Sequence, residues 1–250
     1  MKKVFDKNFE FIESEIDDII VNFKNQGKSI KMSRNILKEF NCKNFKIVIK
    51  SFKKPILINK IIYNFFRQSK AKRSFQHAKL LIAKNINTPK PIAFYEEKTN
   101  FFLKKSFYVC EKIEYDFSMR QVVENLDKYE NQKIIKLFVK FTFHLHEKNI
   151  NFLDHSPGNT LIVRKNDEIF FYLVDLNRMK FEKMSLEKRL INFSRLCAHT
   201  KSKELANLIS SECSNIYGIN KKYAFNIIWK NMLKYRIPYD FKKKLKKYFN

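Results

Sequence analysis

The stretch from residue 149 to residue 159 constrains the fold more than any other part of the chain. It reads Asn-Ile-Asn-Phe-Leu-Asp-His-Ser-Pro-Gly-Asn and offers Asp154 and, five residues later, Asn159. A second segment, 172–175, ends an apolar run on the carboxylate of Asp175. Because Ser-Pro-Gly favours a turn, the sequence predicts a tight loop that presents Asp154 and Asn159.

The segments around this loop predict how it is held. Residues 131–148 repeat apolar side chains at helical spacing, and strand-forming residues fill 160–163 and 170–174. Two strands that pair in a hairpin return Asp175 toward the loop. The predicted order is therefore helix, loop, strand, strand and acid.

This order is the one in which a kinase supplies a base, a metal-binding amide and a metal-binding acid. In that interpretation Asp154 accepts the hydrogen bond of the attacking hydroxyl. Asn159 and Asp175 hold magnesium. The alternative is a merely polar turn at 154–159, with Asp175 as a strand-end cap.

The N-terminal half predicts an antiparallel sheet and a lysine that would bind phosphate. In the run Val48-Ile49-Lys50, apolar neighbours would hold Lys50 toward the α and β phosphates of ATP. Ser33 and Arg34 lie in the loop where a kinase places its glycine-rich phosphate cover, although the loop has no glycine. The expected strands are 28–31, 36–40, 45–52, 92–96 and 106–113.

A helix and a hinge complete the predicted nucleotide site. The helix covers 69–85 and presents Gln76 where kinases have the glutamate that pairs with the strand lysine. We expect Glu111 C=O and Ile113 N–H to contact adenine, with Cys110 at the back of the pocket. An ordinary edge strand would have the same sequence.

The C-terminal half is predicted to be mainly helical. After Asp175 we expect helices at 185–198, 201–217, 221–235 and 240–249, and a helical segment at 118–129 before the long helix. The fold class is then α+β, a two-lobed protein-kinase-like fold with a five-stranded antiparallel N-lobe. We predict one domain over 1–250, with the N-lobe and hinge at 1–113 and the C-lobe at 114–250.

Charge is the unusual bulk property of the chain. It contains 51 Lys and Arg against 25 Asp and Glu, a formal net charge of +26, and its pI is near 9.8. Such a charge favours polyanionic partners, although a genome of low G+C content would also enrich lysine and asparagine. The four cysteines have no metal-type spacing, and no apolar run reaches the roughly 20 residues of a membrane span. The first ten residues carry charges where a signal peptide would need its apolar centre, so we expect no export. We expect a cytoplasmic protein.

Two basic segments could contact an anionic membrane surface. Residues 53–67 mix lysines with an apolar patch, and residues 240–249 form a basic amphipathic end. Ordinary helix packing of the first and solvation of the second are the alternatives. Peripheral contact with the inner membrane is therefore one expectation, and nucleic acid is an unlikely partner.

Several short runs together resemble the lipopolysaccharide core kinases, the small bacterial kinases that include the Kdo and heptose kinases. The resemblance covers about residues 27–181. The runs are Val-Ile-Lys-Ser-Phe-Lys-Lys-Pro (48–55), Ser-Lys-Ala-Lys-Arg-Ser-Phe (69–75), Asn-Thr-Pro-Lys-Pro-Ile-Ala (87–93), Asp-His-Ser-Pro-Gly-Asn (154–159) and Val-Asp-Leu-Asn-Arg-Met (174–179).

The resemblance implies ATP and Mg2+ as cofactors and a sugar hydroxyl of the lipopolysaccharide inner core, or another phosphate-rich saccharide, as acceptor. It gives the family's catalytic and binding roles to Lys50, Asp154, Asn159 and Asp175. The sequence departs from kinase patterns at Gln76, at Phe152 in place of a histidine, and at Asn177 in place of a glycine.

Two other functions fit the same residues. One is a phosphotransferase for a small molecule, of the aminoglycoside or choline kinase type. The other is a catalytically silent kinase fold that binds anionic membrane or nucleic acid. A protein substrate is disfavoured because no proline lies between 176 and 237, so the Ala-Pro-Glu element of protein kinases is absent.

Overall fold

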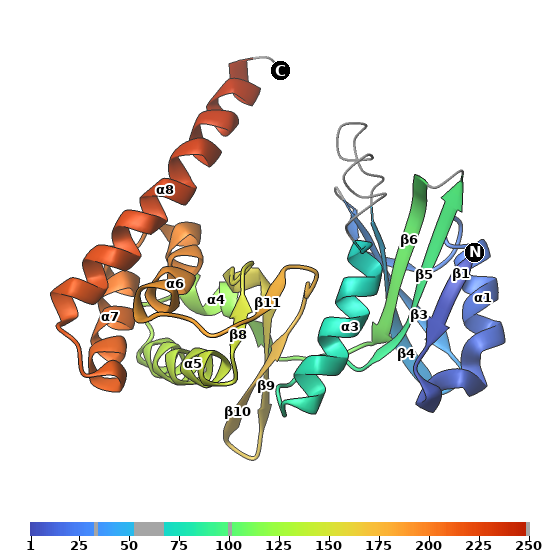
Figure 1. Cartoon of the computed structure of the whole chain (residues 1–250), viewed down its shortest axis with the longest axis horizontal. Helices are drawn as coiled ribbons and strands as arrows, with labels where there is room; N and C mark the ends of the chain where they lie inside the picture. Colours follow the sequence, from blue (N-terminus) through green and yellow to red (C-terminus); the bar gives the residue numbers. More distant parts are fainter. Residues whose placement is uncertain (33–34, 53–67, 100–101, 249–250) are drawn as a thin grey trace. The chain divides into compact units, whose positions relative to one another are not determined.

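The computed structural model describes residues 1–32, 35–52, 68–99 and 102–248 (Figure 1). The chain divides into two compact units. The first contains residues 1–114 together with 175–177, and the second contains 115–174 and 178–250. The prediction of one domain stays a prediction.

The first unit is built on an antiparallel sheet with the strand order β1-β5-β6-β4-β3-β2. The sheet has six strands, one more than predicted, because the N-terminal residues form an additional strand that pairs with β5. The strands are β1 (Lys2–Phe5), β2 (Lys28–Met32), β3 (Ile36–Cys42), β4 (Phe45–Phe52), β5 (Pro91–Thr99) and β6 (Phe102–Glu111).

Helices cover both faces of this sheet (Figure 1). Side chains alternate between the faces, as the two-residue period of a strand requires. One face packs against η1 (Lys7–Ile12) and α1 (Glu13–Val21), and the other packs against α3 (Lys70–Ala83). Ser69 begins α3 as its N-cap, accepting a hydrogen bond from the backbone of Lys72 at 3.0 Å. The helix predicted at 69–85 is thus confirmed.

A buried lysine ties β3 to the segment after α1. Lys38 is 7% exposed, and its Nζ donates to the carbonyls of Phe23, Lys24 and Gln26 at 2.9, 2.9 and 2.7 Å. The ammonium also lies 5.2 Å from the centre of the Phe23 ring. Since carbonyls at a helix end have no partners of their own in the helix, one ammonium satisfies several acceptors there.

The second unit combines short strands with five helices in its described residues. Its core is formed mainly by α4, α5, α6, α7 and the first half of α8. The elements are β7 (Phe117–Ser118), α4 (Met119–Glu124), α5 (Tyr129–Glu147), β8 (Ile150–Phe152), η2 (Pro157–Asn159), β9 (Thr160–Lys165), β10 (Glu168–Leu173), β11 (Met179–Phe181), α6 (Leu186–Thr200), α7 (Lys203–Tyr217) and α8 (Lys221–Tyr248).

Two of the helix predictions need correction. The segment predicted at 118–129 is the shorter α4, which begins with a capping box of Ser118 and Gln121. The two helices predicted at 221–235 and 240–249 are one helix, α8.

The single helix α8 continues through Pro238, where the sequence predicts a break. Contacts on both sides of the proline oppose the break. Arg236 Nε pairs with Asp240 Oδ1 at 2.9 Å, and Lys201 Nζ pairs with Asp240 Oδ2 at 2.6 Å. Arg236 Nη1 also donates to Ala198 O at 3.2 Å, which joins α8 to α6.

None of the helices in the described residues is both long and apolar enough to cross a lipid bilayer. The four cysteines, Cys42, Cys110, Cys197 and Cys213, are free thiols and are buried.

Candidate active site

The predicted phosphate-binding lysine is paired with the predicted metal-binding acid in the first unit. Lys50 Nζ lies 2.7 Å from Asp175 Oδ1, and both side chains are largely shielded from solvent. The ammonium also lies 5.3 Å from the centre of the Phe52 ring. Strand β4 therefore holds Lys50 beside a carboxylate from a segment that is distant in the sequence.

Cys110 lies near this ion pair. Its residue on β6 pairs with Val48 on β4, two residues before Lys50. Burial raises the pKa of the Cys110 thiol to about 12, although the charge of Lys50 opposes the rise. Cys110 is therefore a neutral, apolar neighbour of Lys50 at physiological pH.

The segment 175–177 is held by contacts from its own side chains and from α3. Asp175 has φ of +59°, a left-handed conformation that aspartate tolerates better than most residues. The buried Asn177 donates from Nδ2 to Asp175 Oδ1. His77 on α3 donates from Nδ1 to the carbonyl of Leu176 at 2.7 Å. Burial lowers the pKa of His77, so this ring is neutral at pH 7.

Gln76, one residue before His77, is half-buried on α3. Within the described part of the chain, no hydrogen bond joins Gln76 to Lys50, and the charge beside Lys50 comes from Asp175. The connection between α3 and the 175–177 segment is made by His77. The role predicted for Gln76 stays a prediction.

The predicted base, Asp154, lies in the second unit between two arginines. Arg195 Nη1 on α6 is 3.0 Å from Asp154 Oδ1, and Arg178 Nη1 is 3.6 Å from Asp154 Oδ2. The carbonyl of Asp154 accepts hydrogen bonds from Ser156 N at 2.7 Å and Asn159 Nδ2 at 2.8 Å. Asp154 is thus fixed through its backbone carbonyl by the loop and through its carboxylate by the two arginines.

Asn159 is oriented by the same contacts. Its amide nitrogen is engaged by Asp154 O, so the side-chain oxygen is the atom left to bind a cation. Its backbone carbonyl accepts from Val174 N at 2.9 Å, which ties the loop to the residue before Asp175. A Cβ at Gly158 would lie 2.7 Å from Arg120 Nη2, so a larger residue there would require the arginine side chain to move.

His155 anchors the loop in the core of the second unit. Its ring stacks on Phe138 at 5.1 Å, and Nε2 lies 3.0 Å from Thr142 Oγ1. Thr142 donates its own hydrogen to Phe138 O, so Nε2 must donate to the threonine and Nδ1 carries the lone pair. Phe152, where many kinases have a histidine, is fully buried and packs edge-on against His155.

Of the other residues predicted to contact the nucleotide, Glu111 and Ile113 are among the described residues. Glu111 ends β6, where its N–H donates to Lys90 O at 3.0 Å. Ile113 follows two residues later, after Lys112, whose N–H donates to Lys46 O at 2.8 Å. Ser33 and Arg34 lie outside the described residues.

A metal site made wholly of protein groups is not found among the described residues, where no cluster of three or more His, Cys, Asp or Glu side chains could hold an ion. Asn159 of the second unit and Asp175 of the first unit stay the predicted magnesium ligands. An amide oxygen and a carboxylate are donor types that magnesium accepts, and the ion commonly completes its shell with phosphates and water.

A protein-family model described as the lipopolysaccharide kinase (Kdo/WaaP) family matches residues 25–210. The chain belongs to this family. It is therefore a phosphotransferase, a kinase, as the order of its loop, strands and acid predicts. Lys50, Asp154, Asn159 and Asp175 all lie within the matched region.

A solved structure described as WaaP in complex with acyl carrier protein has a TM-score of 0.63 to this Kdo/WaaP chain at 12% sequence identity. The match covers 94% of this chain and 99% of the other. At this identity it shows the fold alone, and it confirms the predicted α+β protein-kinase-like class. Comparison with curated protein sequences gave no match.

Sequence reasoning missed the three side chains that hold the site's groups in place: His77, Arg178 and Arg195. Arg178 stands between Asp175 and β11, so its closeness to the acid was a signal that could have been used. Arg195 is 41 residues from Asp154 in the sequence, and nothing in the local pattern of α6 distinguishes it.

Proposed function

We propose that this Kdo/WaaP-family chain uses ATP and magnesium to phosphorylate a sugar hydroxyl of the lipopolysaccharide inner core. Family membership supports a lipopolysaccharide kinase. The observation that carries the proposal is the ion pair between Lys50 and Asp175, 2.7 Å apart. It joins two residues that were predicted separately, from two distant segments, to bind the phosphates and the metal of one nucleotide.

Each group then has one task in the transfer. The acceptor oxygen forms a bond to the γ-phosphorus while the bond between that phosphorus and the β,γ-bridging oxygen breaks, and Asp154 accepts the proton of the hydroxyl. Lys50 binds the α and β phosphates, and Asn159 and Asp175 would hold magnesium, which neutralises developing charge on the phosphates. Glu111 C=O and Ile113 N–H are the proposed adenine contacts, and Ser33 and Arg34 belong to the proposed phosphate cover.

The acceptor class is supported by the family and by the charge of the chain. A net charge of +26 suits a saccharide that already carries phosphates or acidic sugars. Such an acceptor is assembled on lipid, so we propose a cytoplasmic protein that contacts the inner membrane peripherally, through residues 53–67 and 240–249. Sedimentation with anionic vesicles should then fall steeply as salt rises.

The similar solved structure suggests one protein partner to test. That structure is of WaaP in complex with acyl carrier protein. We propose that this chain also binds an acyl carrier protein. Co-purification of the two proteins from cells that express both is the measurement, and separate elution on a sizing column would contradict it.

The central test is the substitution Asp154→Asn. With radiolabelled ATP and inner-core oligosaccharide as acceptor, the variant should transfer phosphate at least roughly hundredfold more slowly, since the base is lost and the shape is kept. Asp127→Asn removes an exposed carboxylate in the same unit and is the matched control, with activity unchanged.

Undiminished labelling by Asp154→Asn would contradict the assigned base. Labelling of aminoglycosides or choline in preference to the oligosaccharide would favour the small-molecule alternative. Mass spectrometry compares lipopolysaccharide from cells with and without the gene. Cells without the gene should lack the mass of one phosphate group.

A further inference from the structure

The carboxylate of Asp154 is flanked by more positive charge than it can neutralise. Arg195 contacts one oxygen at 3.0 Å and Arg178 lies 3.6 Å from the other. One carboxylate against two guanidinium groups leaves a local charge of +1. The side chains of Asp154, Arg195 and Arg178 are 25%, 31% and 52% exposed, so the group is open to a ligand.

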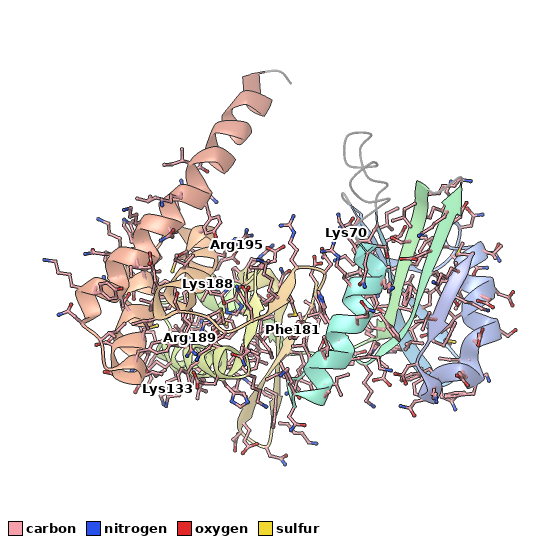
Figure 2. The ribbon with its side chains drawn as sticks, viewed as in Figure 1. Lys70, Lys133, Phe181, Lys188, Arg189 and Arg195 are labelled. Carbon is pink, nitrogen blue, oxygen red and sulfur yellow. The ribbon has the colours of Figure 1, made fainter. Side chains whose placement is uncertain are left out.

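The fold holds the side chain of Arg195 and the backbone of Arg178 by contacts that do not involve Asp154. The guanidinium of Arg195, which projects from α6 (Figure 2), lies 4.7 Å from the centre of the Tyr235 ring on α8. The backbone carbonyl of Arg178 accepts from Leu153 N at 3.1 Å, next to the β8 and β11 pair. The charge of Arg195 is therefore preorganised beside the base, and the backbone of Arg178 is fixed there.

Folding alone does not account for this arrangement. Partly exposed ion pairs contribute only about 0 to 1 kcal/mol to stability. Arg195 hydrogen-bonds one oxygen of the carboxylate that must accept a proton from the acceptor, and Arg178 lies beside the other. An anion that competes for the guanidinium groups would satisfy their charge and release the carboxylate. Planar guanidinium groups match phosphate and carboxylate oxygens in pairs.

We propose that Arg195 and Arg178 bind an anionic group of the acceptor, a phosphate or a carboxylate carried close to the accepting hydroxyl, and thereby free Asp154 for catalysis. The two arginines are then specificity-determining residues that select a charged saccharide over a neutral one. This inference rests on the proposed function and names the feature of the acceptor that the site recognises.

The experiment compares four acceptors made from one inner-core oligosaccharide. They are the native form, a form with its phosphates removed by hydrofluoric acid, a form with its carboxylates reduced to alcohols, and a form treated in both ways. Each is assayed with radiolabelled ATP and with the wild type, Arg195→Met, Arg195→Lys and Arg178→Met.

Arg164→Met is the matched control. Arg164 also pairs with a carboxylate, that of Glu130, and lies 4.8 Å from the centre of an aromatic ring, that of Phe117. It makes the same kinds of contact as Arg195 but does not touch Asp154. Its substitution should change no kinetic constant for any acceptor.

We expect the wild type to prefer the native acceptor over the fully neutral one by roughly tenfold or more in kcat/KM, the scale of one charge-assisted hydrogen bond. Arg195→Met and Arg178→Met should raise the KM for the native acceptor, leave the KM for ATP unchanged and lose most of this preference. Arg195→Lys should recover part of it. If the wild type loses its preference when only the phosphates are removed, the recognised group is a phosphate. If it loses the preference when only the carboxylates are reduced, the recognised group is a carboxylate.

Two results would overturn the inference while leaving the proposed function intact. One is a wild type that phosphorylates charged and neutral acceptors equally well. The other is a loss of activity in Arg195→Met that is the same for all four acceptors, which would mean that the arginine only supports the loop. If the wild type phosphorylates none of the four acceptors, the proposed function fails and this inference fails with it.

Discussion

Two buried histidines in the second unit should make its stability depend on pH. His146 and His155 are 0% and 1% exposed, and burial lowers their pKa values to about 4 and about 3 from the ordinary 6.5. Their hydrogen bonds suit the neutral ring. His146 Nε2 faces Asn192 Oδ1 at 3.1 Å, and the amide nitrogen of Asn192 is engaged by Phe152 O at 2.9 Å.

The magnitude follows from these pKa values. Because each histidine binds a proton more readily in the unfolded chain than in the folded one, stability is complete above pH 6.5 and falls as the pH drops toward 4 and 3. One pKa unit corresponds to about 1.4 kcal/mol. At pH 5 each histidine costs about 2 kcal/mol, and the pair costs about 4 kcal/mol. This is a large part of the roughly 5 to 15 kcal/mol typical of folded proteins.

Urea unfolding at pH 7 and pH 5 measures the effect. Trp229, the one tryptophan of the chain, stacks on Phe225 in the second unit and reports its unfolding by fluorescence. With a urea m-value of about 1 to 3 kcal/mol/M, the midpoint should fall by at least about 1 M between the two conditions. Most carboxylates titrate below about pH 4.5, so they contribute little in this window.

A substitution separates His155 from other groups. His155→Phe keeps an aromatic ring against Phe138 and should remove about half of the pH dependence. Equal midpoints at pH 7 and pH 5 in the wild type would refute the reasoning, as would a full pH dependence in His155→Phe.

Three further predictions concern the first unit. Lys38→Met leaves three carbonyls without their donor and should lower the free energy of unfolding by about 3 to 5 kcal/mol, as measured by calorimetry; a loss below about 1 kcal/mol would contradict the role of its three bonds. Asp175→Asn removes the counter-ion of Lys50 and a proposed metal ligand, so ATP-dependent labelling should fall roughly hundredfold or more, with unchanged circular dichroism. Gln76→Glu should maintain or raise nucleotide turnover if Gln76 faces Lys50, and a collapse of turnover in a folded variant would mean that the helix is misaligned.

The order of the elements could be read from the sequence because each depends on local pattern. Apolar side chains at helical spacing predict α3 and α5, and alternation predicts the strands that carry Lys50 and precede Asp175. The capping serine of α3 and the Ser-Pro-Gly turn before Asn159 mark boundaries that neighbouring residues determine. The sixth strand and the unbroken α8 were missed because both have contacts with residues distant in the sequence.

The sequence by itself determined which groups are the candidates for the chemistry: a lysine on a strand, an aspartate and an asparagine in one loop, and an acid at the end of a hairpin. Only the tertiary structure decided what each of them contacts. Lys50 pairs with Asp175, His77 binds the segment after that acid, and Asp154 lies between Arg178 and Arg195. The physical reason is that charge pairs form between segments far apart in the chain, where no periodicity links one partner to the other.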